Sequence, residues 1–275
     1  MLTSKLGYKK TNEFNVIEKN TEKSTEQVLV KDVIVNSQSI YIVRPTKDGF
    51  YPGIIFLHWL EPHAENSNRT EFLSLAIELA ENHNISSILP DAFWSTTPEK
   101  YKKNPNLGWN TTYENDSKLI LNQLKNILII IDFFKSQSFV DSEKLFFCGH
   151  DFGAMFGCLL GEFKNNIRGY VLMALTSKFS DWFRFGNSLT TVEEFIDYCA
   201  KMSVYDPETN IRTINSEIFF QFALNDFYVP IENALALIAE VEGKSLTKWY
   251  KTNHGMNNEA FEDATNWLLE KISKL

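Results

Sequence analysis

The segment Gly149-His150-Asp151-Phe152-Gly153 places a carboxylate between two glycines at the end of an apolar run. Small residues two positions before and after leave room for a sharp turn from a strand into a helix, which presents the middle side chain at a sheet edge. Serine is usual at that position, and here it is Asp151. An aspartate is ionised at neutral pH, so it can attack an electrophilic carbon without a base that first removes a proton.

Two later residues complete a set suited to hydrolysis. Asp226 follows the apolar run 217–224, and His254 follows the run 246–251, so the chain order is nucleophile, acid, base. A carboxylate that orients a histidine lets its imidazole act as a general base. With Asp151 and Asp226 both beside His254, we expect two negative charges to hold its pKa well above the ~6.5 of a free histidine.

Hydrophobic periodicity predicts the elements that position these residues. We expect strands at 27–35, 38–45, 53–59, 85–90, 144–148, 167–175, 217–224 and 246–251, and helices at 70–83, 114–136, 153–163, 191–202, 231–241 and 257–273. A hairpin followed by alternating strands and helices predicts an α/β fold: a mostly parallel sheet of about eight strands with helices on both faces. The three candidate residues then meet at the carboxyl edge of the sheet.

The domain organisation follows from the same pattern. Residues 1–25 form a polar N-terminal extension, and residues 26–275 form a single domain without repeats or linkers. Residues 176–216, after the sixth predicted strand, form a small cap-like insertion that is too short to fold separately.

Composition limits the possible partners. The 275-residue chain has a net charge of −8, which argues against nucleic acid or an anionic membrane as the main partner. Its three cysteines, Cys148, Cys158 and Cys199, have no disulfide-framework spacing, and no Cys/His set has metal-ligand spacing, so we expect no metal site. The sequence implies no cofactor. Without an apolar leader or a bilayer-length apolar run, we expect a cytoplasmic protein. The pattern carries no signal for an oligomeric state.

The elbow, the residue order and the ending "NDFYVP … NHG" resemble the α/β-hydrolase superfamily over roughly residues 27 to 273. Within it, the small insertion and the ending look most like the dienelactone-hydrolase-like branch, with Asp151 in place of serine. The resemblance implies an oxyanion hole built from the backbone N–H of Phe152 and an N–H in the loop after the third strand. In that loop we expect Leu60, with Trp59 as the alternative, and we expect His58 to tie the loop down.

The resemblance also implies a chemistry. Haloalkane dehalogenases and epoxide hydrolases of the superfamily use an aspartate here, which forms an alkyl-enzyme ester that a histidine-activated water then hydrolyses. Dehalogenases commonly place a tryptophan after the nucleophile, but this chain has Phe152. Epoxide hydrolases use two cap tyrosines; Tyr198 and Tyr205 lie in the insertion at a different spacing, and packing explains them as well. The leaving group therefore stays open.

Aromatic stretches follow strands at the active edge and are expected to wall a substrate pocket. The candidates are Trp59, Trp94, Trp182, Phe227 and Tyr228, and Trp109 is a further indole N–H donor. Core packing is the rival explanation for these side chains. An aromatic pocket suits a small or medium uncharged substrate.

Three functions remain open from the sequence. The first is a hydrolase with Asp151 as nucleophile and His254 activating water on the resulting ester. The second is an esterase or lactonase of dienelactone-hydrolase type that acts through water activated at His254. The third is a non-catalytic binding protein on this fold. The retained Asp226 and His254 favour an enzyme.

Overall fold

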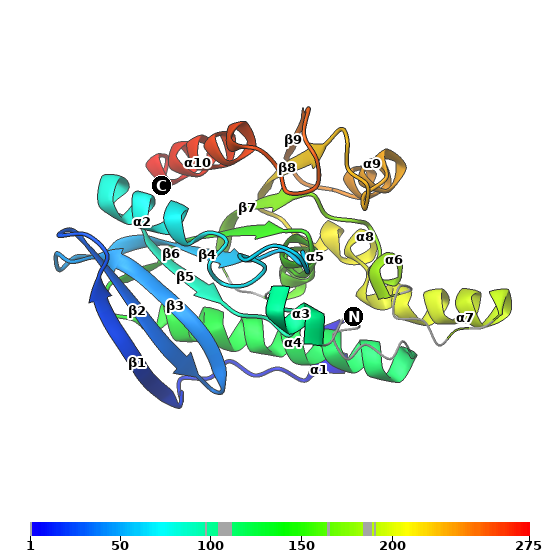
Figure 1. Ribbon diagram of the computed structural model, residues 1–275, viewed down its shortest axis with the longest axis horizontal. Helices are drawn as coiled ribbons and strands as arrows, with labels where there is room; N and C mark the ends of the chain where they lie inside the picture. The colour runs from blue at the N-terminus through cyan, green and yellow to red at the C-terminus, as the bar shows by residue number, and fades with distance from the viewer. Residues whose placement is uncertain (1, 97, 104–111, 164–165, 184–188, 190) are drawn as a thin grey trace.

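The computed structural model describes residues 2–275 except 97, 104–111, 164–165, 184–188 and 190 (Figure 1). The strands are β1 (Val16–Lys23), β2 (Val28–Val35), β3 (Gln38–Pro45), β4 (Tyr51–Leu57), β5 (Ser86–Pro90), β6 (Val140–His150), β7 (Ile167–Met173), β8 (Glu217–Ala223) and β9 (Ser245–Tyr250). The helices are α1 (Leu2–Leu6), α2 (Leu73–His83), α3 (Pro98–Lys103), α4 (Tyr113–Lys135), α5 (Phe152–Cys158), α6 (Phe179–Phe183), α7 (Val192–Met202), α8 (Pro207–Asn210), α9 (Ile231–Ala239) and α10 (Asn258–Ser273).

The described strands form a single nine-stranded sheet with the order β1-β2-β3-β5-β4-β6-β7-β8-β9. Neighbours from β1 to β5 pair antiparallel, and those from β5 across to β9 pair parallel. The parallel part confirms the α/β class and brings the carboxyl ends of β4, β6, β8 and β9 to one edge. Asp151, Asp226 and His254 all follow strands that end there.

Helices cover both faces of the sheet, and each face has its own apolar core. In Figure 1, α4 crosses one face, while α2 and α10 lie on the other. The first core includes residues of α4, α5 and the insertion, and the second includes residues of α2 and α10. The run Ile54–Leu57 of β4 is at most 1% exposed. Burial on both faces explains why this strand is continuously apolar rather than alternating.

The N-terminal segment is part of the sheet, which corrects the expectation of about eight strands. Residues 1–25, expected as a polar extension, contain β1, which pairs antiparallel with β2. Tyr8 also donates a 2.6 Å hydrogen bond to Asp132 on α4, and Leu2 is buried. β1 lies at the edge of the sheet and pairs with β2 alone. Most of its side chains are polar, so the strand lacks the alternation of apolar and polar residues that predicts a strand from sequence.

The 176–216 insertion is more helical than expected. It contains the predicted helix as α7, and also α6 and α8, which are too short to show a periodic pattern. Thr191 begins α7 with a capping box shared with Glu194. The Tyr198 hydroxyl donates a 2.7 Å hydrogen bond to Asp116 at the start of α4, which ties the insertion to the body of the domain. Among the described residues, no helix is long and apolar enough to span a bilayer.

Candidate active site

A strained turn presents the candidate nucleophile. Asp151 joins β6 to α5 with φ 53° and ψ −117°, a conformation that side-chain-bearing residues rarely adopt and that commonly marks functional sites. Its N–H donates to the Met173 carbonyl at 2.8 Å, and its own carbonyl accepts from Met155 N at 2.9 Å. These bonds hold the turn at the end of the parallel strands.

The two elbow glycines are required by packing. A Cβ on Gly149 would lie 2.6 Å from the backbone of Gly153, and a Cβ on Gly153 would collide with the Leu57 carbonyl oxygen. Strand and helix therefore approach each other too closely for any side chain at either position. This is the physical reason for the spacing that the sequence displays.

Asp151, His254 and Asp226 come together in the structure. The Nδ1 atom of His254 lies 2.9 Å from Asp226 Oδ2, and its Nε2 atom lies 3.7 Å from Asp151 Oδ1. Asp226 is itself fixed, because its Oδ1 accepts hydrogen bonds from Tyr228 N at 2.8 Å and Val229 N at 3.0 Å. The acid thus orients the imidazole, and the second ring nitrogen faces the candidate nucleophile.

The two oxygens of Asp151 have different surroundings. The Leu60 N–H donates to Oδ2 at 3.0 Å, while no described residue donates a hydrogen bond to the buried Oδ1. Leu60 is the loop residue expected to supply an oxyanion donor. The alternative, Trp59, donates its N–H to Glu71 Oε2 at 2.7 Å and is not available to the nucleophile. The role of the Phe152 N–H stays a prediction.

His58 anchors the loop that carries Leu60. Its Nδ1 donates to the Trp59 carbonyl at 2.8 Å, and its Nε2 lies 2.8 Å from Ser95 Oγ and 3.2 Å from Ala92 N. Burial lowers the pKa of His58, which keeps the ring neutral and lets Nε2 accept. His58 is 1% exposed, and its hydrogen bonds to Trp59, Ser95 and Ala92 are those of a structural residue.

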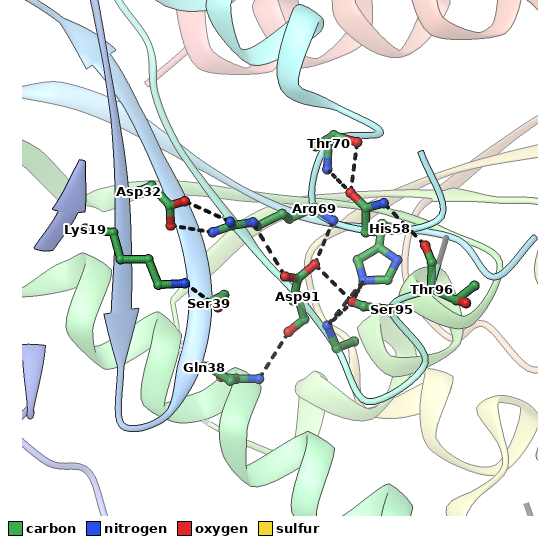
Figure 2. A network of polar contacts seen from close by, with 12 residues as sticks. Lys19, Asp32, Gln38, Ser39, His58, Arg69, Thr70, Asp91, Ser95 and Thr96 are labelled. Atoms are coloured by element: carbon green, nitrogen blue, oxygen red, sulfur yellow. Dashed lines mark hydrogen bonds and ion pairs between the residues drawn. The ribbon is translucent and has the colours of Figure 1, made fainter. Parts of the chain in front are cut away.

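Figure 2 shows how this anchor continues into a charged network. Ser95 Oγ also lies 3.0 Å from Asp91 Oδ1, which accepts from Arg69 N at 3.0 Å. The Arg69 guanidinium makes a bidentate pair with Asp32 on β2 at 2.8 and 2.9 Å. Hydrogen bonds and ion pairs therefore connect this loop to the sheet.

The electrostatics of His254 follow the two carboxylates. Burial disfavours the imidazolium, but the interactions with Asp151 and Asp226 outweigh burial and raise the pKa of His254 to about 10. The direction agrees with the sequence-based expectation. At neutral pH the resting His254 is an imidazolium, which cannot accept a proton from water.

Aromatic rings surround His254, and they are three of the five expected pocket residues. Ring centroids of Tyr228, Trp182 and Trp59 lie 5.1, 5.9 and 6.4 Å from that of His254. Trp94, expected in the pocket, is instead a core residue: it is fully buried, and its Nε1 donates to the His58 carbonyl at 3.3 Å. Some of the expected aromatic residues therefore lie beside His254, whereas Trp94 belongs to the core.

The remaining aromatic candidates lie at the surface, in the core or outside the described residues. Phe227 is 88% exposed beside Asp226, and it lines the rim of a pocket next to His254. Tyr198 and Tyr205 are buried, and Tyr198 is engaged with Asp116. Trp109 lies outside the described residues.

A shallow pocket opens beside His254. It has a volume of about 200 Å³ and is lined by Trp59, Glu61, Asn225, Phe227, Tyr228, Asn253, His254 and Gly255. Asp151 is fully buried and does not line it.

Two buried residues of the site were not singled out from the sequence. Glu71 Oε1 lies 2.6 Å from His150 Nδ1, and His150 Nε2 lies 2.9 Å from the His254 carbonyl oxygen. Because His150 lies inside the elbow motif, its position could have marked it as a residue of the site. Glu71 lies in the expected helix 70–83, where a lone acidic residue carries no signal.

Solved structures share this architecture. The acetyl xylan esterase 1 of Thermoanaerobacterium sp. JW/SL YS485 aligns over 98% of this chain and 92% of its own, with a TM-score of 0.74 and 12% identity. The chain has the α/β-hydrolase fold. A candidate dienelactone hydrolase from Klebsiella pneumoniae aligns over 96% of this chain and 100% of its own, with a TM-score of 0.62 and 14% identity.

A third neighbour is Est1E of Butyrivibrio proteoclasticus with ferulic acid bound, which covers 86% of this chain and 97% of its own, with a TM-score of 0.63 and 17% identity. These neighbours agree with the fold expected from the resemblance. No protein-family model and no curated protein sequence matches the chain.

Proposed function

We propose that this protein is a hydrolase in which Asp151 attacks a saturated, electrophilic carbon of a small or medium uncharged substrate. An alkyl-enzyme ester forms, and water activated by His254 hydrolyses it. The arrangement of the two Asp151 oxygens is the observation that carries the proposal. One oxygen is bound by an oxyanion donor, and the other is unbonded and faces the base.

The first step uses the unbonded oxygen. A lone pair of Asp151 Oδ1 forms a bond to the substrate carbon, and the leaving group departs with the electron pair of its own bond to that carbon. Asp151 loses its negative charge in this step. The pKa of His254, raised to about 10 by Asp151 and Asp226 against burial, then falls. The imidazolium can release its proton to the leaving group or to solvent and become a base.

The second step uses the bonded oxygen. Neutral His254 takes a proton from water through Nε2, and the water oxygen attacks the ester carbonyl carbon of Asp151. Negative charge collects on Oδ2, where the Leu60 N–H already donates at 3.0 Å, so this donor stabilises the tetrahedral intermediate. The ester bond breaks, the product alcohol takes the proton from His254, and a water oxygen stays in the carboxylate.

The esterase alternative fits this arrangement less well. An ester hydrolysed by water activated at His254 needs the oxyanion donor for the substrate carbonyl oxygen, yet the Leu60 N–H is bound to Asp151 Oδ2. Attack of Asp151 on an ester would give a mixed anhydride, a high-energy acyl donor. The esterase names of the structural neighbours favour this alternative, but at 12–17% identity they carry the fold alone.

The non-catalytic alternative leaves the site geometry unexplained. A binding protein needs neither a strained φ of 53° at Asp151 nor a carboxylate 2.9 Å from His254 Nδ1. Strain of this kind persists only where the surrounding structure enforces it, and it costs on the order of 1–3 kcal/mol.

Trapping the intermediate tests the proposal. His254→Gln removes the base but leaves Asp151, so the alkyl-enzyme ester should accumulate. The variant is incubated with phenacyl bromide, an epoxide such as styrene oxide, or an aryl acetate, and the peptide containing Asp151 is weighed. Mass added at Asp151 by a halide or an epoxide supports the proposal. Turnover of the aryl acetate by wild type, with Asp151 never modified by any probe, supports the esterase instead.

A further inference from the structure

His150, directly before the nucleophile, is a buried polar hub with no part in the two chemical steps. The residue is fully buried, and both ring nitrogens have partners. Nδ1 lies 2.6 Å from Glu71 Oε1, and Nε2 lies 2.9 Å from the carbonyl oxygen of His254. A histidine that only filled space here would leave its nitrogens unpaired or would be replaced by an apolar residue at no loss.

The partners decide where the protons lie. A carbonyl oxygen only accepts, so Nε2 of His150 donates to His254 O. Two lone pairs facing each other at 2.6 Å would repel, so one proton also lies on the line between His150 Nδ1 and Glu71 Oε1. Both contacts are therefore real hydrogen bonds, and the second is a short one between charged or chargeable groups.

Glu71 extends the hub to the oxyanion loop. Its side chain is 4% exposed, and its second oxygen, Oε2, accepts the Trp59 N–H at 2.7 Å. The Trp59 ring also stacks on the His150 ring at 5.0 Å and 13°. The residue after Trp59 is Leu60, whose N–H binds Asp151. A shift of Trp59 therefore moves the oxyanion donor.

His150 thus contacts three segments far apart in the chain. It belongs to the elbow, it bonds to the backbone of His254 in the loop after β9, and through Glu71 it holds the loop after β4. Each segment carries one working part of the site: the nucleophile, the base and the oxyanion donor. We propose that His150, together with Glu71, is a positioning residue that sets the base and the oxyanion donor in register with Asp151.

The charged groups around the hub are Asp151, Asp226 and His254, whose ring centroid lies 5.6 Å from that of His150. The site thus holds two neighbouring imidazoles with different tasks. His254 faces the carboxylate that reacts, and His150 faces a carboxylate that does not. This division explains why the elbow carries a histidine next to the nucleophile without a role in proton transfer.

The predicted slowing of the reaction rests on the proposed function, but the predicted shift in the pKa of His254 does not. Two measurements therefore test the two proposals separately. The first is the NMR titration of His254 in the substrate-free protein. The second is the rate at which phenacyl bromide esterifies Asp151. Because wild type hydrolyses its ester, the attack is followed as bromide release in a single turnover. If wild type never releases bromide from phenacyl bromide, the proposed function fails, and the titration still decides the role of His150.

Three variants and a control make the test. His150→Phe alone leaves the Glu71 carboxylate buried without its partner and can unfold the protein. The double variant His150→Phe with Glu71→Leu removes both partners of that bond. Glu71→Gln keeps an oxygen for Trp59 N and a donor for His150 Nδ1. Tyr8→Phe, which removes a partly buried 2.6 Å bond to Asp132, is the control for losing a hydrogen bond outside the site.

We expect the double variant to fold, with the pKa of His254 at least one unit below that of wild type, because imidazole and Asp151 lose their register. Esterification should slow by about 10²-fold with little change in the half-saturating probe concentration. Glu71→Gln should recover most of both losses, and Tyr8→Phe should show neither. A double variant within twofold of wild type, or a Glu71→Gln variant as impaired as the double, would overturn the proposal.

Discussion

At the scale of single residues, the decisive feature is that the two oxygens of Asp151 are not equivalent. Oδ2 is bound by Leu60 N–H, and Oδ1 is buried without a donor among the described residues. A serine elbow leaves its oxyanion donor free for the substrate, whereas here the enzyme's own carboxylate fills it. When Asp151 is esterified at Oδ1, Oδ2 becomes the ester carbonyl oxygen, and it already accepts the hydrogen bond from the Leu60 N–H.

Replacing the nucleophile should change the base in a predictable direction. Asp151→Asn removes one of the two negative charges that raise the pKa of His254 to about 10 against the effect of burial, so that pKa should fall by at least one unit. Covalent modification at this position should drop by more than about 10³-fold. NMR titration and peptide mass measurements check the two effects. An unchanged His254 titration would show that Asp151 does not face the imidazole as described.

The pH dependence separates the two enzymatic mechanisms. Attack by ionised Asp151 needs no neutral histidine, so kcat/KM should be flat between about pH 6 and 9 if esterification limits it. If His254 were the base in the free enzyme, its pKa of about 10 would make kcat/KM rise about tenfold per pH unit over the same range. A steep rise of kcat/KM in this range would therefore contradict the nucleophile role of Asp151.

At the scale of elements, the close approach of α5 to β4 and β6 constrains the site. A side chain at Gly153 would meet the Leu57 carbonyl oxygen on the neighbouring strand. We expect Gly153→Ala to cost about 1–3 kcal/mol of unfolding free energy, because backbone cannot move aside as a side chain can.

Gly243→Ala is the matched control for this substitution. Its Cβ would lie 3.4 Å from the nearest atom, the Ile214 carbonyl oxygen, which is an ordinary contact. Urea unfolding of both variants measures the difference. Equal stability of the two would mean that the elbow is looser than the structure indicates.

Most elements of the fold could be predicted from hydrophobic pattern alone. β4 is continuously apolar because both faces are covered, and α4 has a regular apolar stripe with Thr112 as its cap. β1 was not predicted because a mostly exposed edge strand needs no alternation of apolar and polar residues. The short α6 and α8 escaped because fewer than two turns show no period.

The site was predictable in part, for a related reason. Asp151, Asp226 and His254 each follow a recognisable strand, so topology alone brings them together. Glu71 contacts His150 across 79 positions of the chain, and no local pattern marks such a pair. Trp94 was misassigned because an aromatic residue after a strand can point to the pocket or into the core, and only packing decides which.

At the scale of the whole molecule, a buried hydrogen bond between Tyr198 and Asp116 joins the insertion to the rest of the domain. The environment of Asp116 disfavours its ionised form. Burial raises the pKa of Asp116 to about 6, although the hydrogen bond from Tyr198 lowers it. Since the folded pKa exceeds the unfolded value of 3.8, its proton stabilises the fold fully below about pH 3.8, and that stabilisation is lost as the pH rises through 6.

Asp116→Asn should therefore stabilise the protein at neutral pH. Asparagine stays neutral and keeps an oxygen for the Tyr198 hydroxyl, so we expect a gain of about 1–2 kcal/mol above pH 6 that shrinks as the pH falls toward 4. Asp197→Asn, which removes an exposed ion pair with Lys201 on the same helix as Tyr198, should change stability by less than about 0.5 kcal/mol. Urea unfolding at pH 7.5 and pH 4.5 provides the comparison.

The fate of one oxygen atom tests the central claim of the whole mechanism. Wild-type protein in molar excess converts a halide or an epoxide probe once in heavy-oxygen water, and the peptide containing Asp151 is then weighed. If Asp151 is the nucleophile, the heavy oxygen enters its carboxylate and the product alcohol carries ordinary oxygen from the protein. Turnover that leaves Asp151 unlabelled and places the heavy oxygen in the product would contradict the account.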